Sequence, residues 1–305
     1  MLPDKIRRKL KVVCNRLDRH DLKFFSDSDI ATLQQESAEL LSEGAAAHSE
    51  WIGFQRKILE AFVSDPENFL RADIVAHTLH PAQYGLSSKL IKELLDSPKA
   101  ERYLPLLSES PVGNPLRDPA TSCSSPVLVQ HVHHAMKIEE VFGSIHGFER
   151  IIDIGGGYGG FTKVVKKFGF AGEYVVFDLP VMHRIQNLYL RKVFGFLEDC
   201  ASVSAIKRYS KPSQLQDHLK DRSGRTLLVA TWSLSEMPIA LRDELLEIMP
   251  SVDCAYIAFQ SDFEGIDNLA YFRERFSESK HIAITPQKNF NNNFYLLVGL
   301  PDSEA

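Results

Sequence analysis

The sequence predicts an α/β protein in which a helical N-terminal region precedes a mostly parallel sheet that ends in an antiparallel hairpin. Apolar residues recur at helical spacing through the first third of the chain, whereas short apolar runs alternate with helical stretches after Phe148. The last two apolar runs are joined by a polar turn that is too short for a crossover helix. The alternation predicts parallel strands with right-handed crossovers, and the short final turn predicts the antiparallel pair.

The N-terminal region is expected to consist of several short helices. Its helical pattern runs from Lys5 to about Leu107 and is interrupted by glycine and proline residues. A stretch rich in proline and small polar residues, "SESPVGNPLRDPATSCSSP", follows, and it leads into a helix predicted from about Ser125 with Pro126 at its first position. This stretch is a candidate boundary or active-site cover, so we divide the chain into a helical region, 1–124, and a sheet-bearing domain, 125–305.

The sheet-bearing half contains the predicted strands. Four apolar runs have strand length: Ile151–Ile154, Tyr174–Phe177, Thr226–Ala230 and Cys254–Phe259. Helical stretches such as Thr162–Phe168 and Leu241–Met249 separate them. The final runs, His281–Thr285 and Phe294–Gly299, flank the turn "PQKNFNNN" and should form a hairpin that closes one edge of the sheet.

Composition and charge restrict the partners that we expect. The 305 residues are 44% hydrophobic, which allows a sizeable core, and the formal charge of -5 gives no electrostatic footprint for nucleic acid. No apolar run approaches the roughly 20 residues that span a bilayer, so we expect no membrane partner and a cytoplasmic location. The four cysteines form no metal-binding spacing and are interpreted as reduced thiols: Cys14, Cys123, Cys200 and Cys254.

The stretch "IIDIGGGYGGFTKVV", residues 151–165, has five glycines within six positions between a strand and a helix. Such a loop brings backbone N–H groups and the positive end of a helix dipole close to a ligand. Gly155, Gly157 and Gly160 satisfy G-x-G-x-x-G, and Asp178 lies 21 residues beyond Gly157, as a dinucleotide site requires for a ribose hydroxyl. This spacing fits NAD.

The same loop also fits a cofactor that carries an ammonium group and no pyrophosphate. Asp153 stands two residues before the first glycine, and S-adenosylmethionine (SAM) offers both an ammonium group for this carboxylate and a ribose for Asp178. The position of the loop in mid-chain and the reversed terminal hairpin also favour SAM over NAD. Two alternatives stay open: the glycines can serve only close packing of helix and strand, and Asp178 can serve as a helix cap before Pro180.

The two motifs resemble sequences of class I SAM-dependent methyltransferases. "DIGGGYGG" followed by "YVVFDLP" is similar to motif I and the second-strand motif of that class. Within the class, the segments "FDLPVMHRIQNLYL", "ATWSLSEMP" and "FQSDFEGIDNLAYF" resemble the sugar O-methyltransferase family over residues 150–299. The resemblance implies a Rossmann-like class I methyltransferase sheet with SAM as cofactor, and a helical region that shapes the acceptor pocket and forms a homodimer.

The resemblance also implies roles for individual residues. The glycine loop would line the methionine side of SAM, the end of the second strand would meet the ribose and adenine, and the mouth of the fourth strand would lie near the sulfonium. In that order the residues are Asp153, Gly155, Gly156, Gly157 and Tyr158, then Asp178 and Leu179, then Thr231, Trp232 and Ser233.

The general base is where the sequence departs from the family. Small-molecule O-methyltransferases often carry His then Asp after the fourth strand, and those positions are Ser235 and Glu236 here. Glu236 is the nearest ionisable group and can act as the base, hold acceptor hydroxyls or serve only as a helix-dipole partner. His131 and His134, which share one helix face, are the other catalytic candidates because neutral imidazole abstracts protons near neutral pH.

The polar residues after the fifth strand can be interpreted in two ways. Asp262 and Asn268 lie where an acceptor hydroxyl could be bound, and "NFNNN" at 289–293 offers amides suited to a polyol. Both stretches are also typical of turns, and for the asparagines the turn is favoured. In "HVHHAMK" no histidine or carboxylate pair lies at i, i+4, and His131 with His134 gives only two ligands, so no metal is predicted.

The leading hypothesis is therefore a SAM-dependent O-methyltransferase that acts on a hydroxyl of a sugar or glycosylated small molecule. A NAD(P)-dependent oxidoreductase is the enzymatic alternative, because the glycine spacing fits both cofactors. A non-catalytic SAM-binding scaffold is the other, because a serine occupies the position of the family's histidine.

Overall fold

The computed structural model describes most of the chain as two compact units made of interleaved segments. We call residues 1–136, 157–168 and 179–204 the helical unit, and residues 137–156, 169–178 and 205–305 the sheet unit. The residues described are 23–43, 49–79, 86–119, 121, 123–195, 205–221, 224–278 and 281–299. Cys14 and Cys200 lie outside them, whereas Cys123 and Cys254 are buried. The predicted boundary after residue 124 stays a prediction.

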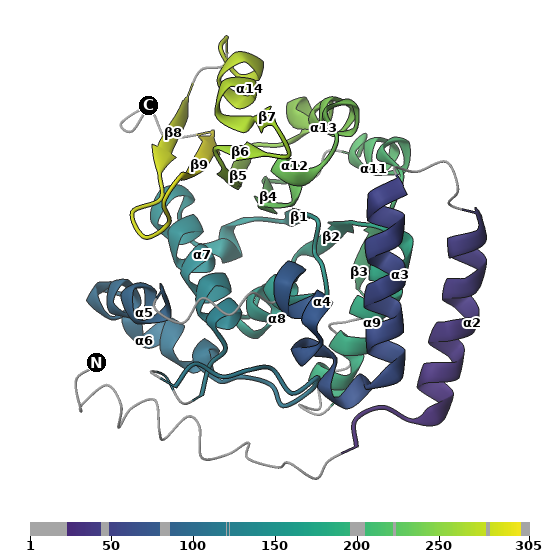
Figure 1. Cartoon of the computed structure of the whole chain (residues 1–305). Coiled ribbons are helices and arrows are strands. Elements are labelled where there is room, and N and C mark those ends of the chain that lie inside the picture. Colours follow the sequence, from purple (N-terminus) through teal and green to yellow (C-terminus); the bar gives the residue numbers. More distant parts are fainter. Residues whose placement is uncertain are drawn as a thin grey trace. The chain divides into compact units, whose positions relative to one another are not determined.

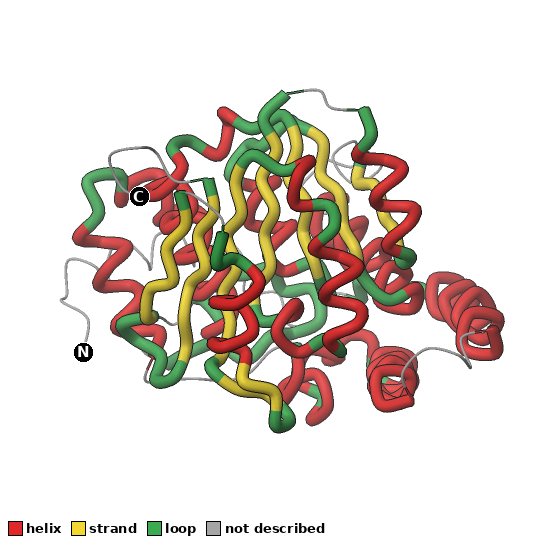
Figure 2. The backbone as a smooth tube through the Cα atoms, turned by 90° about the horizontal axis from the view of Figure 1, so that it is seen from above, coloured by secondary structure: helices red, strands yellow, loops and turns green. Residues whose placement is uncertain are grey.

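The sheet unit contains a seven-stranded sheet with the order β3-β2-β1-β4-β5-β9-β8. Its strands, drawn in yellow in Figure 2, are β1 (Arg150–Ile154), β2 (Glu173–Phe177), β3 (Ile206–Tyr209), β4 (Thr226–Thr231), β5 (Cys254–Gln260), β8 (Ile282–Pro286) and β9 (Asn293–Val298). The first five strands are parallel, and β9 pairs antiparallel with both β5 and β8. The four predicted strands and the terminal hairpin are therefore confirmed, whereas β3 was not predicted.

One face of the sheet carries the apolar core of this unit. Alternate strand residues point to the same face, so Ile152 and Ile154 of β1 share it with Val175 and Phe177 of β2. Buried leucines and phenylalanines from three helices cover these residues: α11 (Pro212–Leu219), α13 (Ile239–Leu246) and α14 (Asn268–Arg275). This core covers the face of the sheet opposite to the one that carries Asp153.

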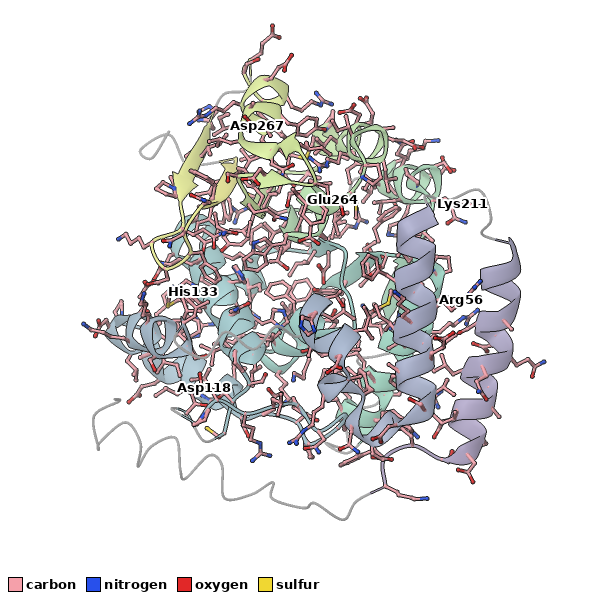
Figure 3. The ribbon with its side chains drawn as sticks, viewed as in Figure 1. Arg56, Asp118, His133, Lys211, Glu264 and Asp267 are labelled. Carbon is pink, nitrogen blue, oxygen red and sulfur yellow. The ribbon has the colours of Figure 1, made fainter. Side chains whose placement is uncertain are left out.

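Short elements complete the sheet unit at the ends of β4 and β5. A four-residue helix, α12 (Ser233–Glu236), follows β4. A small hairpin, β6 (Asp262–Phe263) with β7 (Ile266–Asp267), follows β5, and its turn residues Glu264 and Gly265 both have positive φ, as a type I′ turn requires. Figure 3 labels Glu264 at this turn and Asp267, whose side chain caps α14. The remaining short helices are η3 (Ile145–Gly147) and η4 (Met249–Ser251).

The helical unit confirms that the N-terminal region is helical, although α2 and α3, with 17 and 16 residues, are longer than the short helices that the sequence predicted. Figure 1 shows α2 and α3 running side by side, and α9 packs against both. Ion pairs join α2 to α9: Asp29 accepts from Lys192 at 2.6 Å. The elements are α2 (Asp27–Glu43), α3 (Ser49–Ser64), η1 (Pro66–Arg71), α4 (Asp73–Thr78), α5 (Leu86–Asp96), α6 (Ala100–Tyr103), η2 (Leu104–Leu107), α8 (Gly160–Lys167) and α9 (Pro180–Gly195).

Helix α7 (Pro126–Phe142) begins in the helical unit and ends in the sheet unit. Pro126 stands at its first position, as the sequence predicted. None of the helices in the described residues has the length and apolar character needed to cross a membrane.

A buried ion pair ties the start of α7 to α8 inside the helical unit. The Nζ atom of Lys163 lies 2.7 Å from Oε1 of Glu109, and both side chains are only 2% exposed. The other carboxylate oxygen of Glu109 accepts hydrogen bonds from the backbone N–H and the hydroxyl of Ser125, immediately before α7. Lys163 also lies 3.2 Å from the hydroxyl of Tyr189 on α9. The Glu109–Lys163 pair therefore joins three segments: the residues that precede α7, helix α8 and helix α9.

Replacing Lys163 should destabilise the protein strongly because it leaves the Glu109 carboxylate buried without its cation. We expect Lys163→Met to lower the free energy of unfolding by about 3 kcal/mol or more, measured by denaturant titration followed by circular dichroism. The matched control is Lys220→Met, which removes an exposed ion pair with Asp217 and should cost under about 1 kcal/mol. Equal losses in the two variants would contradict the role of the buried pair.

Candidate functional site

The predicted cofactor residues of the sheet unit meet at the carboxyl ends of three adjacent strands. Asp153 and Gly155 are at the end of β1, Asp178 follows β2, and Trp232 follows β4. Strand β1 pairs with β2 on one side and β4 on the other, so the strand order reverses at this point. Ligands of open α/β sheets bind at such a switch point. The structure therefore brings together residues that lie up to 79 positions apart along the chain, as in the bond from Ser233 to Ile154.

Asp153 is a buried carboxylate with an unusual protonation equilibrium. Its side chain is 2% exposed, and the phenol of Tyr174 donates a hydrogen bond to its Oδ2 at 2.8 Å. Burial raises the pKa of Asp153 from 3.8 to about 7; the hydrogen bond from Tyr174 opposes this shift, and the nearby charge of Asp178 adds to it. A cation bound beside these two carboxylates would therefore favour their ionised forms.

Asp178 is the second acidic residue of this edge. It is half-buried, and its backbone N–H donates to the carbonyl of Tyr209 at the end of β3, 3.1 Å away. The backbone bond fixes the residue between the ends of β2 and β3. The charge of Asp178 raises the pKa of Asp153, so the two carboxylates face a common region.

Gly155 allows the turn after β4 to approach the end of β1. Its φ is +77°, and a Cβ atom at this position would lie 2.2 Å from Cβ of Ser233, whose hydroxyl donates to the carbonyl of Ile154. Close packing is thus one function of this glycine. Gly155, Gly156 and Gly157 are half-exposed, however, whereas the residues on both sides of them are buried, so this bare backbone is the accessible part of the loop.

The second half of the glycine loop belongs to the helical unit. Tyr158 is buried, with its ring centroid 5.1 Å from that of Tyr189, and burial raises its pKa well above the ordinary value. Gly159 has a φ of +95°, and a Cβ atom there would lie 2.9 Å from Gln186 on α9. The amide of Gln186 also donates to the carbonyl of Gly157 at 3.4 Å. Leu179, at the start of α9, accepts a hydrogen bond from the backbone of His183.

The three histidines of α7 have different surroundings. His131 is half-buried against the first turn of α8, where a Cβ atom on Gly160 would lie 2.5 Å from its ring. His134 is 1% exposed, and burial lowers its pKa well below 6.5, which keeps its imidazole neutral. His133, labelled in Figure 3, pairs with Glu93 at 2.9 Å. His131 therefore lies beside the glycine loop, whereas His134 is enclosed.

The turn after β4 separates the roles of Ser235 and Glu236. Ser235 is completely buried, and its hydroxyl lies 2.7 Å from the carbonyl of Trp232 and 2.9 Å from Oε1 of Gln260. Glu236 is half-buried and accepts a hydrogen bond from Nε2 of Gln260 at 3.1 Å. Burial raises the pKa of Glu236, and the charge of Glu264 adds to this effect while Gln260 opposes it. Of this pair, only Glu236 is accessible for proton transfer.

A buried polar network that sequence reasoning missed supports this turn. Arg242 of α13 is 0% exposed, and its guanidinium donates to the carbonyls of Ser235 and Met237 and to Oδ1 of Asn268. Asn268, also fully buried, donates to the backbone carbonyl of Gln260 at 3.1 Å. Asn268, one of the residues considered for acceptor binding, therefore holds the framework of the site.

Comparison with known proteins gives only weak likenesses. No family model matches the chain, and no curated protein matches it. Among solved structures, SAH-bound methyltransferase PaMTH1 of Podospora anserina is 11% identical, with 76% of this chain and 94% of that chain covered and a TM-score of 0.38. The human Mettl16 catalytic domain, solved with an RNA hairpin of the MAT2A 3′UTR, is 11% identical, with 58% and 72% covered and a TM-score of 0.40.

A Thermoplasma acidophilum protein is 12% identical, with 72% of this chain and 99% of that chain covered and a TM-score of 0.35. Likenesses at these TM-scores support no conclusion about the cofactor or the substrate of this chain. The described part of the chain contains no group of three side chains able to hold a metal ion.

Replacing Asp153 should stabilise the protein when no ligand is bound. The pKa of this carboxyl is 3.8 in the unfolded protein and about 7 in the folded protein. The folded state therefore loses stability as the pH rises across this interval. We expect Asp153→Asn, which removes this penalty, to raise Tm little at pH 4 and progressively more up to pH 7, since each pKa unit corresponds to about 1.4 kcal/mol. Differential scanning calorimetry across this pH range measures the effect.

The control for this measurement is Asp217→Asn, which changes an exposed carboxylate on α11. Its Tm difference from the unmodified protein should stay nearly constant with pH. A gain for Asp153→Asn that is independent of pH would show that the carboxyl is not protonated on folding.

Proposed function

We propose that the protein is a SAM-dependent methyltransferase that transfers a methyl group to a hydroxyl of a sugar or glycosylated small molecule. The main support for SAM as the cofactor is the pair of carboxylates, Asp153 and Asp178. They lie beside half-exposed glycine backbone at the switch point of the sheet. A buried carboxylate whose pKa is raised to about 7 favours a cationic ligand and opposes a pyrophosphate. This charge preference supports SAM over NAD.

The residues present fit such a cofactor. Asp153 would hold its ammonium group, Asp178 would bind its ribose hydroxyls, and the half-exposed backbone of Gly155 and Gly156 would face the cofactor. The reversed β8–β9 hairpin supports the same choice, because a dinucleotide-binding sheet continues with a parallel sixth strand. SAM supplies an activated methyl group on a positively charged sulfur.

The remaining chemistry falls to this chain's own residues. For transfer of that methyl group to a hydroxyl, the residues of this chain would have to orient the acceptor oxygen and remove its proton. Glu236 would take this proton at a carboxylate oxygen, since it is half-buried, lies at the carboxyl end of β4 and is oriented by the amide of Gln260. Its raised pKa makes it a stronger base than an ordinary carboxylate.

A second candidate is a SAM-binding scaffold without turnover. Ser235 stands where the family that the sequence resembles has its histidine, and its buried hydroxyl is bonded to Trp232 and Gln260. A protein that binds SAM but methylates nothing in a broad screen of sugars and glycosides would favour this candidate.

Asp178→Ala should weaken SAM binding by at least tenfold, because the ribose loses its hydrogen-bond acceptor. Isothermal titration calorimetry with SAM, S-adenosylhomocysteine (SAH) and NADH provides the measurement. Asp217→Ala, an exposed carboxylate of α11, is the matched control and should bind SAM as the unmodified protein does. Tight NADH binding without SAM binding would overturn the proposed cofactor.

Glu236→Gln should reduce turnover by about a hundred to ten thousand fold, the usual contribution of a positioned base. Its SAM affinity should stay near that of the unmodified protein, and the acid limb of the pH–rate profile should disappear. The assay is mass-spectrometric detection of methylated sugars or glycosides found by the screen. His134→Ala and His131→Ala are compared in parallel; a large loss in His131→Ala with an active Glu236→Gln would transfer the role of base to α7.

A further inference from the structure

Trp232 adopts a backbone conformation that a bulky residue rarely takes. Its φ is +66° and its ψ is −34°, which costs of the order of 1–3 kcal/mol and persists only where the surroundings impose it. Three groups do so here. Its backbone N–H donates to the carbonyl of Ala258 at 2.7 Å, its carbonyl accepts from the N–H and hydroxyl of Ser235, and its indole Nε1–H donates to Oδ1 of Asn293 at 2.7 Å.

The turn between β8 and β9 is built to hold this indole. Asn292 has a φ of +55°, and its carbonyl accepts from the backbone of Ser261 at 2.7 Å, which anchors the turn to the end of β5. The side-chain amide of Asn293 donates to the carbonyl of Asn291 at 2.8 Å, which leaves Oδ1 directed at Trp232. The asparagines thus form a turn, as favoured from the sequence, but one of them also positions an aromatic ring.

A second aromatic ring from the same turn lies against the indole. The centroid of Phe290 is 5.6 Å from that of Trp232, at an interplanar angle of 51°, and both side chains are half-exposed. Phe290 is held in place because its N–H donates to the carbonyl of Gln287, a residue that is itself 3% exposed and bonded to Phe294. The two rings therefore form a fixed aromatic corner with accessible surface.

Hydrogen-bonding groups lie next to this corner. Gln260 is the register partner of Asn293 in the β5–β9 pair, and it donates to Glu236. Apolar ring surface beside an amide and a carboxylate suits a ligand with an apolar face and several hydroxyl groups.

The carboxylates near the corner disfavour anionic ligands, although the same turn carries one exposed cation, Lys288. Glu236 carries a raised pKa partly because of the charge of Glu264, and Asp262 stands at the exposed start of the same small hairpin. The cation of this region with a described role, Arg242, is buried and occupied by carbonyls and Asn268. A phosphate-bearing acceptor or a nucleic acid would meet carboxylates here.

We infer that Trp232 and Phe290 form the acceptor subsite, and that they bind an uncharged pyranose ring stacked against the indole, with its hydroxyls directed to Glu236 and Gln260. This inference rests on the proposed function and adds residues and a ligand class to it. Phe290 and Asn293 become specificity and positioning residues, respectively, contributed by the terminal hairpin.

The test uses Trp232 as its own probe. The chain has two tryptophans, so in the full-length Trp51→Phe variant the emission comes from Trp232 alone. With SAH at saturation, this variant is titrated with methyl pyranosides of several configurations, with sorbitol and with glucose 6-phosphate. We expect at least one methyl pyranoside to change the emission saturably, sorbitol to have no effect because it lacks a ring face, and the phosphate to bind more weakly.

Two further variants separate recognition from folding. Phe290→Leu in the same background should weaken pyranoside binding at least tenfold, while its SAH affinity stays within about twofold. Lys288→Ala, an exposed position in the same turn, should leave both affinities unchanged. If Phe290→Leu alters Tm but not pyranoside binding, the aromatic corner only fastens the hairpin to the sheet, and the inference is wrong.

The outcomes distinguish this inference from the proposed function. SAH binding without any pyranoside effect on Trp232 overturns the subsite and leaves the cofactor proposal standing. Saturable binding of a single-stranded oligonucleotide that competes at Trp232 also overturns it. Failure to bind SAH overturns the proposed function, whereas pyranoside binding lost in Phe290→Leu would still support the subsite.

Discussion

The buried guanidinium of Arg242 holds the turn that follows β4, and the side chains at that end of the sheet take their positions from this turn. Helix α12 has only four residues, too few to be stable by its own hydrogen bonds. Arg242 binds the carbonyls of Ser235 and Met237 at its end and reaches Asn268 at the start of α14. Because a buried cation must satisfy its donors, this arrangement is strongly determined. Trp232, Glu236 and Gln260 are all placed by it.

The two carboxylates of the site illustrate how environment divides function between identical groups. Asp153 and Glu236 both have raised pKa values because burial disfavours their charged forms. Asp153 is enclosed at the end of β1 and accepts a hydrogen bond from the phenol of Tyr174, which suits it to bind a cation. Glu236 is half-exposed and bonded to an amide, which suits it to exchange a proton.

The sequence predicted the local features of this architecture and missed the long-range ones. Continuous apolar runs identified β1, β2, β4 and β5, since buried parallel strands require them, and the reversed hairpin followed from a turn too short for a helix. Strand β3 was not predicted because only Ile206 of its four residues is buried, and Lys207 and Arg208 interrupt the apolar run. Asp153 was placed correctly at the strand end, but its hydrogen bond to Tyr174 depends on the register of β1 against β2, which periodicity does not reveal.

Other site residues were beyond sequence reasoning for the same reason. The contact between Trp232 and Asn293 spans 61 positions and exists only because β9 pairs with β5. The buried role of Asn268 depends on Arg242, a residue that resembles an ordinary charged position of an amphipathic helix. Patterns of apolar spacing describe which face of an element is buried, whereas polar networks are chosen by tertiary neighbours.

The antiparallel direction of β9 has a consequence for how this protein can diversify. Since β9 runs opposite to β5, its beginning rather than its end lies at the edge where the other strands finish, and the turn before it comes with it. The glycine loop and the turn that precedes β9 are consequently encoded more than 120 positions apart. Insertions or substitutions in the turn can change which acceptor is recognised without disturbing the glycine loop at β1. The terminal hairpin can therefore vary while the cofactor-binding part of the site stays the same.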